Sequence, residues 1–381
     1  MPTIHPQPSP HFCGIIPPHM LEHLARSPEE DLREAARRSL ALDAHNREQR
    51  ALTALRTLAP APPPAAPPTA PGSAPSPQRT IHDAGHHARL PGPAVRAEGS
   101  APIADESADR AYEGLGATFD FFLGAYGRRS VDGLGLPLVA TVHYGVRYDN
   151  AFWNGSQMVF GDGDGRVFND FTASLDVIAH ELAHGVTQYT ANLDYRGQSG
   201  ALNESLSDVF GSLVKQYALG QTAEQADWLI GAELLAPGVH GIALRSLKAP
   251  GTAYDDPDLG RDPQPATMAG YVRTAADNGG VHLNSGIPNR AFQLAATALG
   301  GHAWERAGQI WYDVLTGGAL AATADFAAFA AATAGAARER YGEGPEFRAV
   351  REAWAEVGVR AEVEVTSVTD LAGAAPPATW N

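Results

Sequence analysis

Two histidines and a glutamate in one short stretch have the spacing of a metal-dependent reaction site. His180 and His184 are four residues apart in the run SLDVIAHELAHGVTQY, whose apolar residues recur with helical spacing. On a helix of about 3.6 residues per turn, both imidazoles leave the same face, so their neutral nitrogens can bind one cation. Glu181 is rotated by about 100° from His180, which puts it beside that cation, where a general base acting on water belongs. The alternative is a surface helix with two ordinary histidines.

The segment GALNESLSD argues against that alternative, because it starts a second predicted helix and supplies a carboxylate. Glu204 follows His184 by twenty residues, and Asp208 lies one turn further on. Two histidines and one glutamate leave the fourth position of a tetrahedral zinc ion open for water, which is the arrangement of catalytic sites. The sequence therefore predicts one zinc ion bound by His180, His184 and Glu204.

A third histidine lies in the glycine-rich segment DNGGVHLNSGI. Asp277 precedes His282 by five residues and is placed to orient and charge its imidazole. A charged imidazole can donate a hydrogen bond to a developing oxyanion. On local sequence alone, a histidine in such a turn more often has a structural role.

Composition limits the other classes of function. The 381 residues are 44% hydrophobic and carry a net charge of −15, which argues against nucleic acid or an anionic membrane as partner. The single cysteine, Cys13, excludes an internal disulfide. The first twenty residues do not resemble a signal peptide, and no stretch approaches the roughly 20 apolar residues of a membrane span. We therefore expect a protein that stays in the cytoplasm or is secreted by a non-classical route.

Composition shifts divide the chain into five segments. Ser27-Pro28-Glu29-Glu30 has the pattern of a helix start, and the following helix should run to about Leu58. Residues 59–78 contain nine prolines in twenty, typical of a semi-rigid spacer that proteases cut. The expected segments are a short propeptide (1–58), a Pro/Ala-rich linker (59–78), a β-rich lobe (79–173), a helical lobe (174–360) and a tail (361–381).

Local patterns predict the elements of the two lobes. Residues 138–148 alternate like a strand, and a second strand ends at the DGDG run of Asp162 to Gly165, which we interpret as a tight turn and not as a calcium loop. Helices are expected at 109–126, 174–189, 201–218, 288–299, 302–316, 324–334 and 345–357.

The motifs NAFWNG, FGDGDG, HELAH, GALNESLSD, an RS pair at Arg245, and DNGGVHLNSGI occur in the order found in one family. From about Arg79 to Val359 the chain resembles the thermolysin family of zinc metalloendopeptidases. The segment IIPPHML resembles the short propeptide of its protealysin-like subgroup. The resemblance implies an α+β fold of two lobes with the zinc cleft between them.

The resemblance also implies residue roles. Glu181 would take a proton from water and pass it to the leaving amine. Tyr195 and His282 would stabilise the oxyanion, while Asp208 and Asp277 would orient His180 and His282. Substrate contacts would come from Asn150, the backbone of Ala151, Arg245, and an apolar pocket formed by Phe168, Phe171, Val177, Ile230 and Leu244. Such a pocket predicts cleavage on the amino side of a bulky hydrophobic residue.

The chain departs from the family pattern at the double calcium site. Asp176 and Asp227 remain, but the other matching positions are Lys215, Leu229 and Ala232. We expect the ammonium of Lys215 to replace calcium between the two acids, so that zinc is bound without structural calcium there. The alternative is a solvated helix lysine.

Two features of the precursor complete the interpretation. We expect a monomer whose cleft is covered by the propeptide until the propeptide is cut off. Cys13, beside Pro17-Pro18, is either a packed hydrophobe or a thiolate ligand of the zinc. A catalytically silent peptide-binding protein is disfavoured because Glu181 is present. An aminopeptidase is disfavoured because no acids are evident to hold a free amine.

Overall fold

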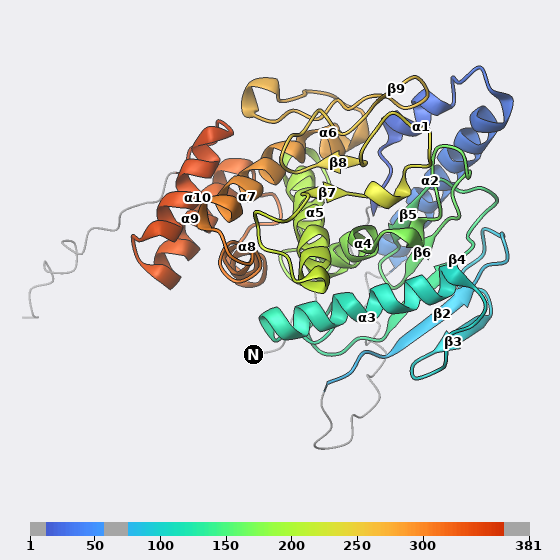
Figure 1. The fold of residues 1–381 in the computed structure, drawn as a ribbon, viewed down its shortest axis with the longest axis horizontal. Helices are drawn as coiled ribbons and strands as arrows, with labels where there is room; N and C mark the ends of the chain where they lie inside the picture. The colour runs from blue at the N-terminus through green and yellow to red at the C-terminus, as the bar shows by residue number, and fades with distance from the viewer. Residues whose placement is uncertain (1–12, 57–74, 362–381) are drawn as a thin grey trace, which may run out of the picture.

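The computed structural model describes residues 13–56 and 75–361 of the chain. Most of the expected linker and nearly all of the expected tail lie outside these residues. The described part has a β-rich lobe and a helical lobe, and helix α4 (Leu175–Gln188) runs where they meet (Figure 1). This is the two-lobed α+β architecture that the sequence predicted.

The N-terminal segment forms one short strand and two helices. β1 (Cys13–Gly14) is followed by α1 (Pro18–Leu24) and the long α2 (Glu30–Arg56), drawn in blue in Figure 1. Pro18 occupies the first turn of α1, where a missing backbone N–H costs nothing. The side chains of this segment that are buried include Ile15, Ile16, Met20, Leu21 and Leu24, so the apolar cluster expected here is formed.

The β-rich lobe is built on a six-stranded sheet in the order β1-β5-β6-β4-β2-β3. Its other strands are β2 (Arg79–Asp83), β3 (Ala94–Ala97), β4 (Leu138–Val142), β5 (Ala151–Trp153) and β6 (Met158–Phe160). Helix α3 (Glu106–Tyr126) packs against β2, β4 and α4. β1 therefore adds the N-terminal segment to the sheet edge that β5 would otherwise leave unpaired.

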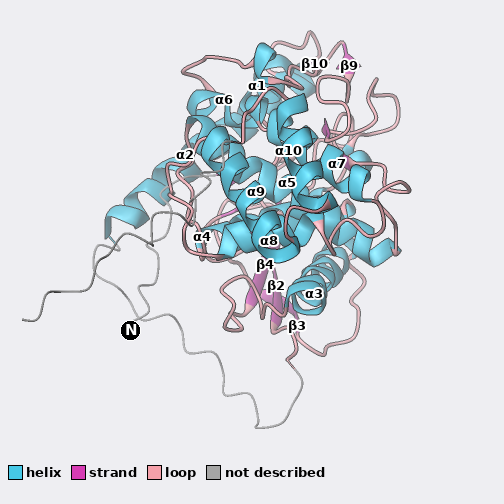
Figure 2. Cartoon of the chain, turned by 90° about the vertical axis from the view of Figure 1, so that its left-hand side faces the viewer, coloured by secondary structure: helices cyan, strands magenta, loops and turns pink. Residues whose placement is uncertain are grey.

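The helical lobe packs around α5 (Gly197–Leu219), which lies against α4. Figure 2 shows its C-terminal helices toward the viewer, with β2, β3 and β4 below them. The helices are α6 (Asp277–Asn284), α7 (Gly286–Leu299), α8 (Ala307–Thr316), α9 (Phe326–Tyr341) and α10 (Pro345–Glu356). Short elements complete it: η1 (Phe171–Ala173), η2 (Ala232–Leu234), η3 (Met268–Gly270), β7 (Leu229–Ile230), β8 (Arg245–Ser246), β9 (Asp255–Asp256) and β10 (Gly260–Arg261).

Three expected elements differ from the structure by five residues or more at one end. The strand expected over 138–148 stops at Val142, because His143 and Arg147 take left-handed backbone angles, with φ of 54° and 51°. The helix expected over 324–334 continues to Tyr341, and the one expected from residue 302 begins only at Ala307. None of the helices within 13–56 and 75–361 is long and apolar enough to cross a bilayer.

Candidate active site

Helices α4 and α5 bring the predicted zinc ligands together. Along α4 every side chain from Asp176 to Gln188 is buried. A Cβ added at Gly211 of α5 would lie 2.5 Å from the Asp176 carbonyl oxygen of α4, so this glycine permits close packing of the two helices. Glu204 is thereby placed opposite the histidines, with Oε2 3.6 Å from His180 Nε2 and Oε1 3.4 Å from His184 Nε2.

The two imidazoles are neutral, which makes this cluster suited to binding a cation. Nδ1 of His180 lies 2.8 Å from Asp208 Oδ1, and Nδ1 of His184 donates to Asn203 Oδ1 at 2.8 Å. Both Nε2 atoms then present lone pairs, and they face each other at 3.1 Å. Burial lowers the pKa of His180 to about 4 and that of His184 to about 3, so both rings are neutral at pH 7.

These separations fit a tetrahedral zinc ion. Nitrogen and oxygen ligands at about 2.0–2.1 Å from zinc lie about 3.4 Å apart, close to the distances among His180, His184 and Glu204. Two lone pairs facing each other without a cation would repel. Oε2 of Glu204 is also buried with no hydrogen-bond partner in the described part of the chain. The residues present therefore suit the metal that the sequence predicts.

The carboxylate of Asp208 is held by two residues besides His180. Arg245 donates to it from Nε at 2.9 Å and from Nη2 at 2.8 Å, and Asn289 donates from Nδ2 at 2.8 Å. Burial opposes ionisation, but the guanidinium and the imidazole together hold the pKa of Asp208 well below its ordinary value. Asp208 therefore stays anionic beside His180, which favours the Nδ1–H tautomer.

Sequence reasoning missed the partners of His184. Asn203 accepts from its ring, and Ser207 Oγ lies 3.0 Å from the same nitrogen. Both residues lie close to Glu204 on α5, within the motif GALNESLSD. The only signal was their helical spacing, which places them on the side of α5 that faces α4.

Glu181 lies in the same cluster and is wholly buried. Its Oε2 accepts from the backbone N–H of Trp153 at 2.9 Å, while Oε1 has no hydrogen-bond partner among the described residues. Burial, and then the nearby carboxylate of Glu204, raise the pKa of Glu181 well above its ordinary value. A carboxylate with raised pKa and one open oxygen is suited to accept and return a proton.

His282 reaches the cluster from the other side, on α6. Four consecutive residues, 277–280, have φ between 50° and 91°, which folds the chain so that Asp277 turns back on the ring. Nδ1 of His282 donates to Asp277 Oδ1 at 2.6 Å. Burial lowers the pKa of His282, but the carboxylates of Asp277 and Glu204 outweigh it and raise the pKa to about 9. Nε2 lies 3.3 Å from the hydroxyl of Tyr195, which donates to Glu204.

The residues expected to bind substrate instead hold the N-terminal segment. β1 pairs antiparallel with β5, with Cys13 opposite Trp153 and Gly14 opposite Phe152. Ile15 N donates to the Ala151 carbonyl at 3.0 Å. The Ile15 carbonyl accepts from Arg245 Nη1 at 2.9 Å, and Ile16 N donates to Asn150 Oδ1 at 2.9 Å. Ile15 is wholly buried in the apolar cluster that contains the five expected pocket residues, Phe168, Phe171, Val177, Ile230 and Leu244.

Comparisons with known proteins agree with this geometry. A family model for the thermolysin metallopeptidase catalytic domain matches residues 96–188, and one for the alpha-helical domain matches residues 191–359. The chain belongs to the thermolysin family of zinc metalloendopeptidases. It is 53% identical over 353 residues to an extracellular metalloprotease of Pectobacterium carotovorum, covering 93% of this chain and 98% of that one.

Two further relatives of this thermolysin-family chain are informative. It is 44% identical over 299 residues to an extracellular minor metalloprotease of Serratia marcescens, covering 78% of this chain and 81% of that one. The solved structure of the protealysin precursor from Serratia proteamaculans matches with a TM-score of 0.80 and 53% identity, covering 91% of this chain and 99% of that one. The expected resemblance to this family and to protealysin is confirmed, and the enzyme is made with a propeptide.

The same comparisons correct the expected location. We expected a cytoplasmic protein or one secreted by a non-classical route. The thermolysin-family relatives from P. carotovorum and S. marcescens are named extracellular metalloproteases, which points to secretion. The expectation was wrong because it rested on failing to recognise a signal sequence, and such an absence does not assign a compartment.

Lys215 lies where the thermolysin-family pattern would have an acid of the double calcium site. Its Nζ is 2.8 Å from Asp176 Oδ2, 3.0 Å from Asp227 Oδ2 and 3.2 Å from the Leu229 carbonyl. The side chain is 8% exposed, so it is not a solvated helix lysine. Burial lowers the pKa of Lys215, but the two carboxylates outweigh it and hold the pKa above its ordinary value.

Cys13 packs beside the predicted zinc ligands, His180, His184 and Glu204, which we call the metal cluster. It forms a small apolar group with Tyr195 and Val281, and its sulfur and one donor atom each of His184 and Glu204 lie within 4.8 Å of one another. Burial and the Glu204 carboxylate raise the pKa of the thiol well above its ordinary value, which favours the neutral form. These contacts are compatible with both of the roles considered for it.

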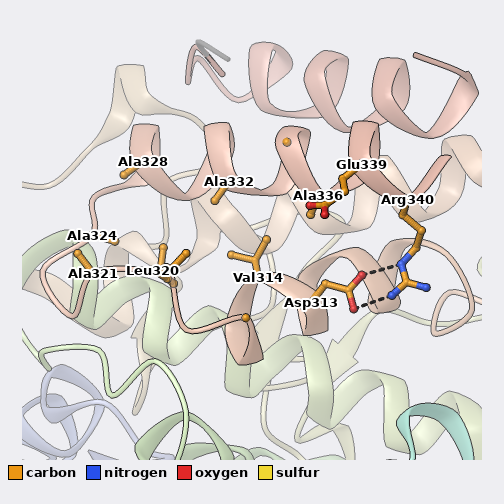
Figure 3. Close-up of a pocket in the computed structure, with 13 residues that line it drawn as sticks. Asp313, Val314, Leu320, Ala321, Ala324, Ala328, Ala332, Ala336, Glu339 and Arg340 are labelled. Atoms are coloured by element: carbon orange, nitrogen blue, oxygen red, sulfur yellow. Dashed lines mark hydrogen bonds and ion pairs between the residues drawn. The ribbon is translucent and has the colours of Figure 1, made fainter. Parts of the chain in front are cut away.

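A separate cavity of about 830 Å³ lies in the helical lobe, lined by α8, α9 and the segment that joins them. Figure 3 shows small side chains such as Ala328 and Ala332 on one side, and an ion pair between Arg340 and Asp313 at the end. Arg340 Nε is 2.6 Å from Asp313 Oδ2. The residues that line this cavity include none of those placed at the metal cluster, so the hydrolytic chemistry of this thermolysin-family enzyme belongs to the cleft.

Proposed function

We propose that this chain is a precursor whose mature enzyme cuts peptide bonds on the amino side of a bulky hydrophobic residue. The observation that carries the proposal is the binding of Ile15. Its N–H and its carbonyl bond to Ala151 and Arg245, two of the residues expected to bind substrate, and its side chain is wholly buried in the main core that also contains the expected pocket residues. A free peptide would make the same antiparallel pairing with β5, because main-chain pairing does not depend on side-chain identity.

His180, His184 and Glu204 are the proposed ligands of one zinc ion. When bound, zinc supplies Lewis-acid polarisation of the scissile carbonyl and lowers the pKa of water at the site. Asp208 and Asn203 fix the rings of the two histidines through their Nδ1 atoms. The support is the fit of the ligand separations and the neutral state of both imidazoles.

Glu181 is the proposed general base and then general acid. Its carboxylate takes a proton from the attacking water and returns it to the amine as the C–N bond breaks. The Trp153 N–H fixes one oxygen of Glu181 and leaves the other open for this transfer. Tyr195 and His282 are the proposed donors to the carbonyl oxygen as negative charge develops there.

The role of Asp277 can be tested through the pH dependence of the rate. Because Asp277 raises the pKa of His282, we expect Asp277→Asn to lower that pKa, so the imidazolium is lost earlier as pH rises. The alkaline limb of kcat/KM should move to lower pH. The rate at pH 8 should fall on the order of 10-fold, less than the roughly 10²–10³-fold loss from removing an oxyanion donor. The measurement is a kcat/KM profile of the processed enzyme; an unmoved alkaline limb would contradict the assignment.

We further propose that the enzyme is a monomer without calcium at the double site, where Lys215 neutralises Asp176 and Asp227. The support for a site without calcium is the three short contacts of the Lys215 ammonium. The proposed propeptide comprises residues 1–58, and the cut that removes it is proposed to lie in the linker, residues 59–78. The proposed lobes of the mature enzyme are residues 79–173 and 174–360.

Calcium should therefore not affect the thermal stability of this enzyme. We expect the Tm of the Glu181→Gln variant, which avoids autolysis, to shift by less than about 1 °C between excess calcium and a calcium-selective chelator, since ligand binding stabilises a protein only in proportion to ln(1 + [L]/Kd). A zinc chelator should lower the Tm of the same sample and serves as the positive control. A large calcium-dependent rise in Tm would refute the proposal.

A further inference from the structure

We propose that the Gly14–Ile15 peptide bond is a cleavage site for the chain's own active centre, so that the precursor loses residues 1–14 by a cut within the propeptide. This cut is separate from the one that removes the propeptide at the linker. The inference rests on the proposed function, because it uses the same catalytic groups. It adds the identity of a substrate bond in this chain.

The register of the N-terminal segment points to this bond. Two hydrogen bonds and the burial of its side chain define Ile15 as the residue just after the cut: Ile15 N donates to the Ala151 carbonyl, the Ile15 carbonyl accepts from Arg245, and the side chain is wholly buried. The next residue follows the same register, since Ile16 N donates to Asn150 Oδ1 at 2.9 Å. The bond on the amino side of the pocket residue is therefore Gly14–Ile15.

The carbonyl of Gly14 gives an independent observation. Its oxygen accepts from His282 Nε2 at 3.0 Å, and that nitrogen lies 3.3 Å from the Tyr195 hydroxyl. These are the two groups proposed to stabilise the oxyanion. A carbonyl already hydrogen-bonded to an oxyanion donor is the one that a nucleophile at the site would attack.

Glu181 is anchored next to the strand that pairs with β1, and a cavity lies beside the Gly14 carbonyl. Glu181 is fixed on the N–H of Trp153, which pairs directly with Cys13 across the two strands. A cavity of about 320 Å³ is lined by Gly14, Tyr195, Asp277 and His282, among others. A water molecule occupies about 30 Å³, so the cavity has room for several beside the Gly14 carbonyl.

Glycine at position 14 allows this close approach. A Cβ added there would lie 2.8 Å from Asn150 Nδ2, closer than carbon and nitrogen atoms pack. Asn150 cannot move away freely, because its Nδ2 donates to Asp43 at 3.0 Å and its Oδ1 accepts from Ile16. While Asp43 of α2 holds Asn150 in place, the strand can therefore lie flat against β5 at this position only with a glycine.

The reaction is a simple hydrolysis and needs no further reactant. Water adds to the carbonyl carbon of Gly14, and its proton passes to Glu181. The bond from that carbon to the Ile15 nitrogen breaks, and Glu181 gives the proton to this nitrogen. The products are a Gly14 carboxylate and an Ile15 amino terminus. Arg245 and Asn150 still hold Ile15 and Ile16, so this cut alone leaves the substrate-binding half of the cleft filled.

The experiment uses full-length, zinc-loaded protein, with intact mass and N-terminal sequencing followed over time. We expect a new chain that begins at Ile15, formed at a first-order rate that is unchanged on tenfold dilution because the bond is bound in the same molecule. In parallel, a synthetic peptide of residues 9–21 is added to enzyme freed of its propeptide by limited digestion within the linker. We expect one cut in it, between the glycine and the first isoleucine.

Variants show whether the cut depends on the position of Ile15 in the cleft and on the catalytic group Glu181. Ile15→Leu keeps a bulky pocket residue and should keep the cut, and Cys13→Ala should keep it because main-chain contacts set the register. Ile15→Asp should lower the cut at least 10-fold, and Glu181→Gln should lower it by about 10²-fold or more.

Each outcome of the experiment decides. Glu181-dependent casein hydrolysis with an intact Gly14–Ile15 bond in chain and peptide overturns the inference and leaves the proposed function standing. A cut at another bond of the peptide also overturns it. Failure of the freed, zinc-loaded enzyme to hydrolyse casein overturns the proposed function itself.

Discussion

Replacing Glu181 by glutamine is expected to lower kcat/KM for peptide hydrolysis by about 10²–10⁴-fold, the range associated with loss of general acid–base catalysis. Glutamine keeps the shape of the side chain and can still accept from the Trp153 N–H, so the cleft should stay intact. It cannot take a proton from water at neutral pH, and it has none to give to the leaving amine. Both proton transfers of the reaction are therefore affected by one substitution.

The measurement compares initial rates on a quenched peptide that carries phenylalanine or leucine after the cut. Both proteins are freed of the propeptide by the same added protease, so that a failure to self-process does not enter the comparison. Zinc content should be equal, since Glu181 is not among the proposed ligands. Glu352→Gln, at an exposed position on α10, serves as the matched control. A Glu181→Gln rate within about threefold of wild type would reject Glu181 as the base.

The convergence of His180, His184 and Glu204 was predictable because its determinants are local. A four-residue spacing fixes the relative direction of His180 and His184 on any helix. The observed helix α4, Leu175–Gln188, is one residue shorter at each end than the helix expected over 174–189. Asp277 could be paired with His282 because DNGG favours the left-handed angles that the structure has there. In both cases a few adjacent residues carry the geometry.

The binding of the propeptide was predictable only in outline. The resemblance of IIPPHML to a propeptide suggested a covered cleft, but the register depends on pairing Gly14 with Phe152, far apart in the chain. No local pattern sets such a pairing. The same limit applies to Arg245, which was expected at a substrate carbonyl. It makes that contact with Ile15 and also neutralises Asp208, a second role that only the packing of α5 against β8 reveals.

The strand expected over 138–148 failed for a different reason. Alternation of apolar and polar residues continues past Val142, but His143 and Arg147 turn the backbone into left-handed conformations. His143 is held there between two acids, with Nδ1 2.7 Å from Asp162 Oδ1 and Nε2 2.9 Å from Asp105 Oδ2. Asp105 also caps α3, accepting from the Ala108 N–H. Tertiary contacts thus override a periodicity that is correct for only half of the segment.

Replacing Lys215 by methionine is expected to lower the free energy of unfolding by about 3–5 kcal/mol, the cost of removing one partner of a buried ion pair. Methionine has a similar length and no charge, so it leaves Asp176 wholly buried with its charge uncompensated. Asp227 contributes less because its side chain is 45% exposed and can be solvated. The chain offers a matched control, since its other lysine, Lys248, is exposed and Lys248→Met should change stability by less than about 0.5 kcal/mol.

The pH dependence of this loss distinguishes an unpaired charge from poor packing. Burial already raises the pKa of Asp176, and the Lys215 ammonium opposes that rise. Without the ammonium, the folded-state pKa of Asp176 lies further above its unfolded value, so the folded variant binds more protons than the unfolded one. Stability of Lys215→Met should then increase as pH falls toward the pKa of Asp176, and decrease as pH rises. Thermal unfolding of wild type and variant at pH 5 and pH 8, in the Glu181→Gln background, measures this difference.

A second substitution completes the test of the Lys215 site. Asp176→Asn combined with Lys215→Met removes both charges, and asparagine can still accept from the Gly231 N–H and from Ser174 as Asp176 does. We expect the double variant to recover most of the lost stability at pH 8, because a neutral pair leaves no buried charge. If the two substitutions instead add, and if the loss in Lys215→Met is the same at pH 5 and pH 8, the lysine contributes through its hydrocarbon chain. Its charge would then not be what replaces calcium at this site.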